Sequence, residues 1–135
     1  MFALESPIIA RLAALPALAG WQVRSSAAET SRKTVPAVEV RCEGAGASDK
    51  GMAALIDVKW GVHLIAARGD GAMAALDVAF AAVVGSLHNW KPGTEGDHPW
   101  LPLKLRDVEP VEIAEQGLVA YSLIFQTSAP YYGQQ

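Results

Sequence analysis

The sequence predicts a single α+β domain in which two helices cover a mostly antiparallel sheet. Three observations lead to this prediction. Two segments place apolar residues at helical spacing, five segments alternate apolar and polar residues with the period of a strand, and the chain of 135 residues has the length of one domain. The predicted order is α-β-β-β-α-β-β across residues 1–135, followed by a short flexible tail at residues 129–135.

The first predicted helix lies close to the N-terminus. Four aliphatic residues spaced by four, four and three positions share one face of it: Leu4, Ile8, Leu12 and Leu15. Pro7 follows Ser6 in the order typical of a helix start, with a capping side chain before a proline. We expect Pro16 to end this helix.

Three strands are predicted between the two helices. Residues 21–24 form a short apolar run, and the polar residues 25–34 that follow predict a long exposed loop. Residues 35–43 alternate, with Val38, Val40 and Cys42 on one face and charged side chains on the other. Residues 43–51, which read EGAGASDKG, predict a second loop. The period of two over residues 57–67 predicts the longest strand.

The second helix is predicted over residues 73–87, with Asp70 as its cap. Six large apolar residues keep a helical stripe there: Met73, Leu76, Phe80, Val83, Val84 and Leu87. Residues 88–102 are rich in Gly and Pro and predict a loop. Residues 101–106 predict an edge strand, because Pro102 has no N–H to donate to a neighbouring strand. The last predicted strand ends at residues 128–130 and carries four large side chains on one face: Val119, Tyr121, Leu123 and Phe125.

Composition narrows the class of protein. The chain has 11 Lys and Arg against 14 Asp and Glu, a net charge of -3, which argues against a basic nucleic-acid-binding protein. No segment has the pattern of a signal peptide or a membrane span, so we expect a soluble, cytoplasmic protein. The chain is 51% hydrophobic, but much of that share is alanine, which buries little surface. A modest core favours association with further copies.

Candidate chemistry is sparse, and the sequence predicts no enzyme, no cofactor and no metal site. His88, His98 and Asp97 are the one set with any prospect of binding zinc, and the alternative is a pair of surface histidines beside a turn aspartate. Four acidic residues near the C-terminus form either a solvated sheet edge or, less simply, a catalytic carboxylate pair. These are Asp107, Glu109, Glu112 and Glu115. Cys42 lies in an alternating apolar run, as a reduced core thiol does.

Two tryptophans in the loop of residues 88–102 stand out. Trp90 and Trp100 lie among polar, Gly and Pro residues. Such a loop either folds back over the core or presents its tryptophans to a partner, because Trp is common at the centres of interfaces.

The order of several short motifs resembles the tail terminator (tail completion) proteins of long-tailed bacteriophages. The motifs are LE at residues 4–5, IARL at 9–12, LHNWKPG at 87–93 and GLVAYSLIFQT at 117–127, so the resemblance spans nearly the whole chain. It implies a structural virion protein that forms a hexameric ring, caps the tail tube, stops its polymerisation and provides the surface that joins the neck or head.

The resemblance also implies partners and a location. The implied partners are further copies of the chain, the tail tube protein, a neck or connector protein and a sheath protein, while DNA passes through the channel without specific binding. The protein would lie at the neck-proximal end of the virion tail, and in the host cytoplasm during assembly. Two alternatives stay open: another neck or tail assembly protein, and a small metal-dependent hydrolase that uses His88, His98 and Asp97.

Two sets of residues are candidates for contacts in such a ring. The two predicted loops carry four charged residues expected to contact the tube or neck: Arg32, Lys33, Asp49 and Lys50. The tryptophan-bearing loop carries four residues expected at the subunit boundary: Trp90, Lys91, Pro92 and Trp100. The alternative for the charged set is an ordinary solvated loop.

Overall fold

The computed structural model describes residues 1–27, 35–113 and 117–134. The helical elements are η1 (Phe2–Leu4), α1 (Glu5–Ala13), η2 (Pro16–Leu18), α2 (Ala72–Leu87) and η3 (Glu95–Asp97). The strands are β1 (Gln22–Ser25), β2 (Ala37–Lys50), β3 (Ala53–Ala67), β4 (Lys104–Pro110) and β5 (Leu118–Tyr132). The predicted order α-β-β-β-α-β-β is confirmed. No helix in the described ranges is long and apolar enough to span a membrane.

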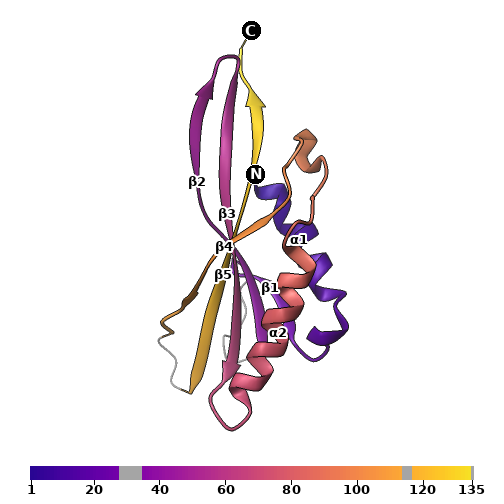
Figure 1. The fold of residues 1–135 in the computed structure, drawn as a ribbon, viewed down its shortest axis with the longest axis vertical. Coiled ribbons are helices and arrows are strands. Elements are labelled where there is room, and N and C mark those ends of the chain that lie inside the picture. The colour runs from indigo at the N-terminus through magenta and orange to yellow at the C-terminus, as the bar shows by residue number, and fades with distance from the viewer. Residues whose placement is uncertain (28–34, 114–116, 135) are drawn as a thin grey trace.

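The strands form one sheet in the order β1-β2-β3-β5-β4. β1 pairs with β2 in parallel and the other three pairs are antiparallel, so the predicted α+β class with a mostly antiparallel sheet is confirmed. Both α1 and α2 lie against the same face of this sheet (Figure 1). The three central strands are much longer than the helices and extend beyond them at one end (Figure 1).

The core lies between the two helices and the sheet face that they cover. The helical stripe of α1 is confirmed, because Leu4, Ile8 and Leu12 are fully buried. The largest fully buried side chains are Trp60 from β3, Trp100 from the loop before β4, and Phe125 from β5. Large residues on the strands therefore fill the space that the alanines on the helices leave.

The loop predicted at residues 43–51 is wrong, because β2 continues through it to Lys50. Residues 44–50 pair with residues 53–59 of β3, and only Gly51 and Met52 form the turn. Gly51 has a positive φ of 76°, which the tight turn of a two-residue hairpin requires and which glycine adopts without strain. Backbone pairing with β3 thus overrides the turn-prone composition of the segment.

The predicted end of the last strand at residues 128–130 and the flexible tail at residues 129–135 are also wrong over residues 129–132. β5 continues to Tyr132 and pairs with the start of β3, where Ala53 lies opposite Tyr132. Pro130 fits within this strand as the partner of Leu55. Ala129 is buried, so this part of the chain belongs to the folded domain.

Both predicted helix caps are wrong. Ser6 lies inside α1, which begins directly from η1 with Leu4 at the capping position. At α2 the capping position is taken by Gly71 with a φ of 83°, and no side chain bonds to the first turn. Strand β4 begins at Lys104 rather than Leu101, because Leu101 and Leu103 pair their N–H groups with the carbonyls of Ser128 and Trp90 instead.

Candidate functional site

The most distinctive surface is a three-stranded extension of the sheet, which we call the arm. It comprises residues 44–50 of β2, 53–59 of β3 and 126–132 of β5, and it rises past the ends of both helices (Figure 1). Every residue of β2 from Glu43 to Lys50 is exposed, whereas Ala37 to Val40 of the same strand are buried. We call the remainder of the domain, which contains the helices, the body.

A β-bulge marks the junction between body and arm. The register between β2 and β3 shifts between Cys42 and Gly44, so Glu43 is the inserted residue. Its carboxylate reaches across the sheet face opposite the helices to His63, with 2.8 Å between Oε1 and Nε2. The Arg41 guanidinium lies 3.8 Å from the other carboxylate oxygen of Glu43.

Glycine at position 61 makes this contact across the sheet possible. A Cβ added to Gly61 would lie 2.3 Å from the Glu43 Oε1 atom and 2.9 Å from its Cγ. Any side chain at position 61 would therefore force the Glu43 side chain away from His63. The bulge, Gly61 and His63 together fix where the arm leaves the body.

The same sheet face carries a buried ion pair inside the body. Arg24 of β1 donates from Nε to Oε2 of Glu39 on β2 at 2.9 Å, and both side chains are less than a tenth exposed. Buried charges are costly unless paired, so this pair fixes the parallel alignment of β1 on β2. Glu39 belongs to the charged face that the alternation of residues 35–43 predicts, but no signal in the sequence indicated that this face is buried.

The two edges of the sheet differ in their protection. β4 forms one edge and carries three devices that discourage pairing with another strand: a bulge at Arg106, exposed charges at Asp107 and Glu109, and Pro110 at its end. The predicted solvated acidic edge is confirmed for Asp107 and Glu109, and Glu112 is exposed as well. Glu115 lies outside the described residues.

The opposite edge, on the arm, lacks these devices over residues 44–48, although the Glu43 bulge precedes this stretch and the charged Asp49 and Lys50 follow it. β1 pairs with β2 only as far as Val40, and no described strand covers the outer edge of residues 41–50. The stretch from Gly44 to Ser48 contains neither a proline nor a charge. The Val40 carbonyl accepts the Ser26 N–H, so the backbone groups of Val40 face β1. Along a strand these groups point alternately to its two sides, and the one inserted residue shifts this alternation. The N–H groups of Ala45 and Ala47 therefore point away from β3. The arm therefore offers an open row of backbone hydrogen-bonding groups.

The charged contact candidates divide between this arm and the undescribed part of the chain. Asp49 and Lys50 lie at the arm tip, which we define as residues 49–52. The Asp49 carboxylate accepts the Gly51 N–H at 2.9 Å and stabilises the turn. Arg32 and Lys33 lie outside the described residues. Sequence analysis assigned Asp49 and Lys50 to a loop, whereas they end strand β2, and their contact with a tube or neck stays a prediction.

Of the two tryptophans in the loop before β4, Trp100 folds back over the core, which was the first of the two predicted alternatives. Trp100 is fully buried and donates its indole N–H to the Glu95 carbonyl at 3.0 Å. Pro92 is also buried, and Lys91 is exposed. Trp90 is partly buried beneath Arg11, whose guanidinium carbon lies 4.8 Å from the centroid of the Trp90 ring. The subunit-boundary role of this set stays a prediction, and only Trp90 and Lys91 offer appreciable surface for it.

The structure does not bring together the residues of the metal-site alternative, His88, Asp97 and His98, as a set of ligands. No group of three His, Cys, Asp or Glu side chains within the described ranges is placed to hold a metal ion. The ring of His88 accepts the Leu105 N–H at 3.0 Å, while His98 stacks on Tyr131 with ring centroids 3.5 Å apart. Burial raises the pKa of the Tyr131 phenol, consistent with its packing against the core. These histidines thus have structural contacts in two different places.

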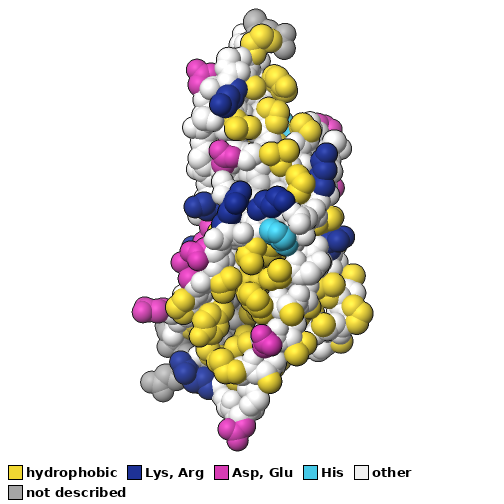
Figure 2. Space-filling model, in the orientation of Figure 1, with side chains coloured by type: hydrophobic (Ala, Val, Ile, Leu, Met, Phe, Trp, Pro, Cys, Tyr) yellow, Lys and Arg dark blue, Asp and Glu magenta, His cyan; other side chains and the backbone are white. Residues whose placement is uncertain are grey.

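An apolar groove lies on the helix-bearing face of the body, which we call the α2–β4 groove. It has a volume of about 190 Å³ and an apolar lining formed by Leu64, Met73, Leu76, Phe80, Val108 and Tyr121. Figure 2 shows hydrophobic side chains gathered over this part of the face, between α2 and the β4–β5 side of the sheet. Met73 and Val108 at its rim are 59% and 41% exposed, so the body carries a second unoccupied surface besides the arm.

Comparison with known proteins finds likenesses among solved structures. No protein-family model matches the sequence, and no curated protein matches it. Among solved structures, a chain from the virion of a native gene transfer agent (GTA) particle matches with a TM-score of 0.70. The match covers 94% of this chain and 94% of that chain at 14% sequence identity, so the two share a fold.

Proposed function

We propose that this chain is a structural virion protein of a phage-like particle, and that it acts there as a tail terminator. In this role it forms a ring, expected to be a hexamer, that caps the tail tube, stops its polymerisation and provides the joining surface for the neck. The observation that carries the proposal is the shared fold with a chain of a gene transfer agent virion over 94% of both chains. The order of the sequence motifs supports the terminator role in particular.

The unprotected edge of the arm supports self-association. An exposed strand without charges or proline is a template for pairing with another strand, and monomeric proteins generally blunt such edges. This chain blunts β4 but leaves residues 44–48 of β2 open. A ring of identical subunits gives that edge a permanent partner.

The partners follow from the same role. They are further copies of this chain, the tail tube protein, and a neck or connector protein, with a sheath protein beside them where the tail has one. Asp49 and Lys50 at the arm tip are the contact candidates that the structure describes. The net charge of -3 is compatible with a ring through which DNA passes without being held.

A polymerisation assay tests the terminator role directly. Purified tail tube protein from the same particle is allowed to elongate with and without this chain, and tube length is measured by negative-stain electron microscopy. We expect shorter tubes with an added ring at one end. Tubes of unchanged length with no bound ring would overturn the terminator role, as would tight, salt-sensitive binding to duplex DNA.

A substitution on the open edge tests how the ring forms. Ala47→Pro removes an outward N–H without removing a bond to β3, and Ala47→Val keeps that N–H and serves as the matched control. We expect the proline variant to stay monomeric in sedimentation velocity and the valine variant to assemble as the parent does. Equal assembly of both would show that this edge takes no part.

A further inference from the structure

The arm tip of this chain carries an exposed apolar side chain with a positive charge next to it. Met52 is 55% exposed at the turn, and Lys50 precedes it by two residues. The carboxylate of Asp49 is already engaged by the Gly51 N–H. In the described part of the chain Lys50 forms no ion pair, so the tip offers an apolar knob beside an unpaired cation.

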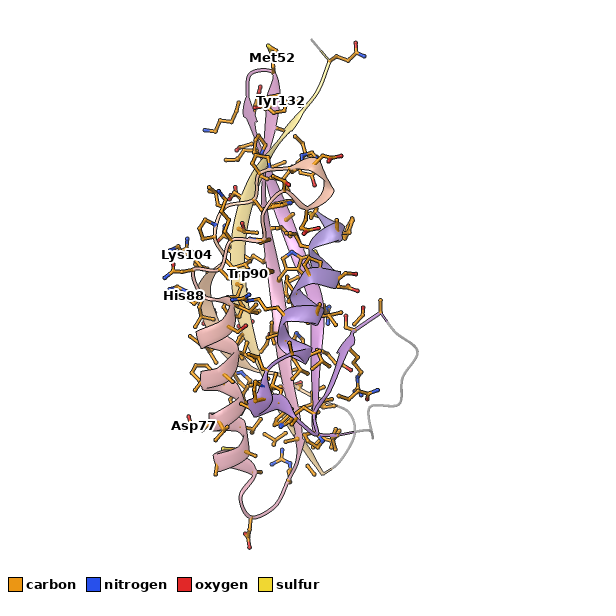
Figure 3. All side chains as sticks on the ribbon, turned by 90° about the vertical axis from the view of Figure 1, so that its right-hand side faces the viewer. Met52, Asp77, His88, Trp90, Lys104 and Tyr132 are labelled. Atoms are coloured by element: carbon orange, nitrogen blue, oxygen red, sulfur yellow. The ribbon has the colours of Figure 1, made fainter. Side chains whose placement is uncertain are left out.

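The α2–β4 groove has the complementary properties. Its lining is apolar except for Asp77, which is exposed on α2 and forms no ion pair with any described residue. Figure 3 shows Asp77 on the outer side of α2, far from Met52 at the opposite end of the molecule. The groove thus offers an apolar hole beside an unpaired anion.

The size and the chemistry of the α2–β4 groove also suit a methionine side chain. A cavity of roughly 150 Å³ is large enough to hold a benzene molecule, so the groove volume of about 190 Å³ leaves room for one methionine side chain. Two of its walls are aromatic, Phe80 and Tyr121, and methionine sulfur makes favourable contacts with aromatic rings. Met73 at the rim is flexible enough to adapt to what enters.

We propose that the α2–β4 groove binds the arm tip of a second copy of this chain, with Met52 inserted between the aromatic walls and Lys50 paired with Asp77. The proposal rests on the self-association proposed above and assigns it a specific contact. Met52 at the arm tip and Asp77 at the groove lie far apart along the molecule, so the tip and the groove cannot contact each other within one chain (Figure 3). In the proposed ring this contact runs head-to-tail, the type that generates a closed ring when the rotation closes and a filament when it does not.

A charge reversal across the contact tests the proposal. We expect Lys50→Asp and Asp77→Lys each to weaken self-association about two- to fivefold, because each leaves two like charges facing. The double variant, in which the pair is reversed, should return to within about twofold of the parent. Asp70→Lys, at an exposed turn outside the groove, is the matched control and should assemble as the parent does. The measurement is the association constant of the full chain from sedimentation velocity over a concentration series.

A second pair of variants tests the apolar part. Met52→Ser should weaken association roughly tenfold, because it removes the side chain that the groove buries. Val78→Ser changes an α2 residue of similar exposure that does not line the groove, and it should have no effect. Both positions are exposed, so neither variant endangers folding.

The outcomes separate this contact from the ring itself. A parent chain that assembles while the tip and groove variants all assemble equally well overturns the contact and leaves the ring standing. The same holds if the double charge variant is as weak as the two single variants combined, or if groove variants impair capping of the tube without changing self-association. A parent chain that stays monomeric at every concentration overturns both proposals.

Discussion

The body and the arm are built from the same three strands, yet they use them differently. In the body, β2 and β3 bury residues on both faces, including Glu39 and His63 on the face opposite the helices. In the arm, β2 buries nothing from Glu43 onward. The β2 part of the arm therefore contributes little to the core of the subunit, whereas Val58 of β3 and Ala129 of β5 are buried in it. In the proposed ring, this exposed segment of β2 would serve contacts outside the subunit.

The largest effect that would sharpen this contrast is expected from Trp100 in the body. Trp100→Ala removes a fully buried indole and should lower the free energy of unfolding by about 3–5 kcal/mol. Urea denaturation of the monomer measures this change. If the tryptophan acted chiefly at a subunit boundary, the variant monomer would keep the stability of the parent and lose only its assembly.

A somewhat smaller loss is expected from the buried ion pair. Glu39→Gln removes the negative charge that faces the buried Arg24 guanidinium, and should cost about 3 kcal/mol of unfolding free energy. The exposed acid Glu109 on β4 provides the control, because Glu109→Gln should change stability by less than about 0.5 kcal/mol. Equal stability of both variants would mean that the pair does not anchor β1.

At the junction, Gly61→Ala should cost about 1–2 kcal/mol, because the new methyl group displaces Glu43 from His63. His63→Ala removes the same contact by another route. The double variant should therefore cost less than the two single losses added together, as expected of residues that share one interaction. Additive losses in thermal or urea unfolding would show that Gly61→Ala does not act through the contact between Glu43 and His63.

The smallest effects on stability are expected in the β2 strand of the arm. Ala45→Thr and Ser48→Ala change exposed positions on β2, and each should alter the free energy of unfolding by less than about 0.5 kcal/mol. A loss of 2 kcal/mol or more in the monomer would break the contrast between arm and body. It would show that the arm stabilises the subunit after all.

Sequence patterns predicted the body much better than the arm, for a physical reason. Leu4, Ile8 and Leu12 share one buried side of α1, as Trp60, Val62 and Leu64 do on β3, and burial of such a side is what produces the pattern. Residues 44–50 bury no face, so nothing in their side chains records that they form a strand. Their conformation comes from backbone pairing with β3, which composition cannot reveal.

The contact candidates show the same limit. Asp49 and Lys50 were identifiable as exposed charges, but their place on a stiff hairpin depends on that pairing. Trp100 was recognisable as unusual in a polar loop, yet the choice between core and interface needed the position of Tyr131, whose ring centroid lies 6.0 Å from its own. The α2–β4 groove was not predicted, because its walls come from strands and a helix distant in sequence.

The pleat of the arm also limits how its length can change. Each strand alternates the direction of its side chains with every residue and rises about 3.3 Å per residue. Adding one residue to each strand of the hairpin would turn Met52 and Lys50 toward the other face, while adding two would restore their direction and move the tip outward by about 7 Å. The reach of the arm can thus be altered only in steps of two residues per strand, so related chains that span different gaps should differ in arm length by even numbers.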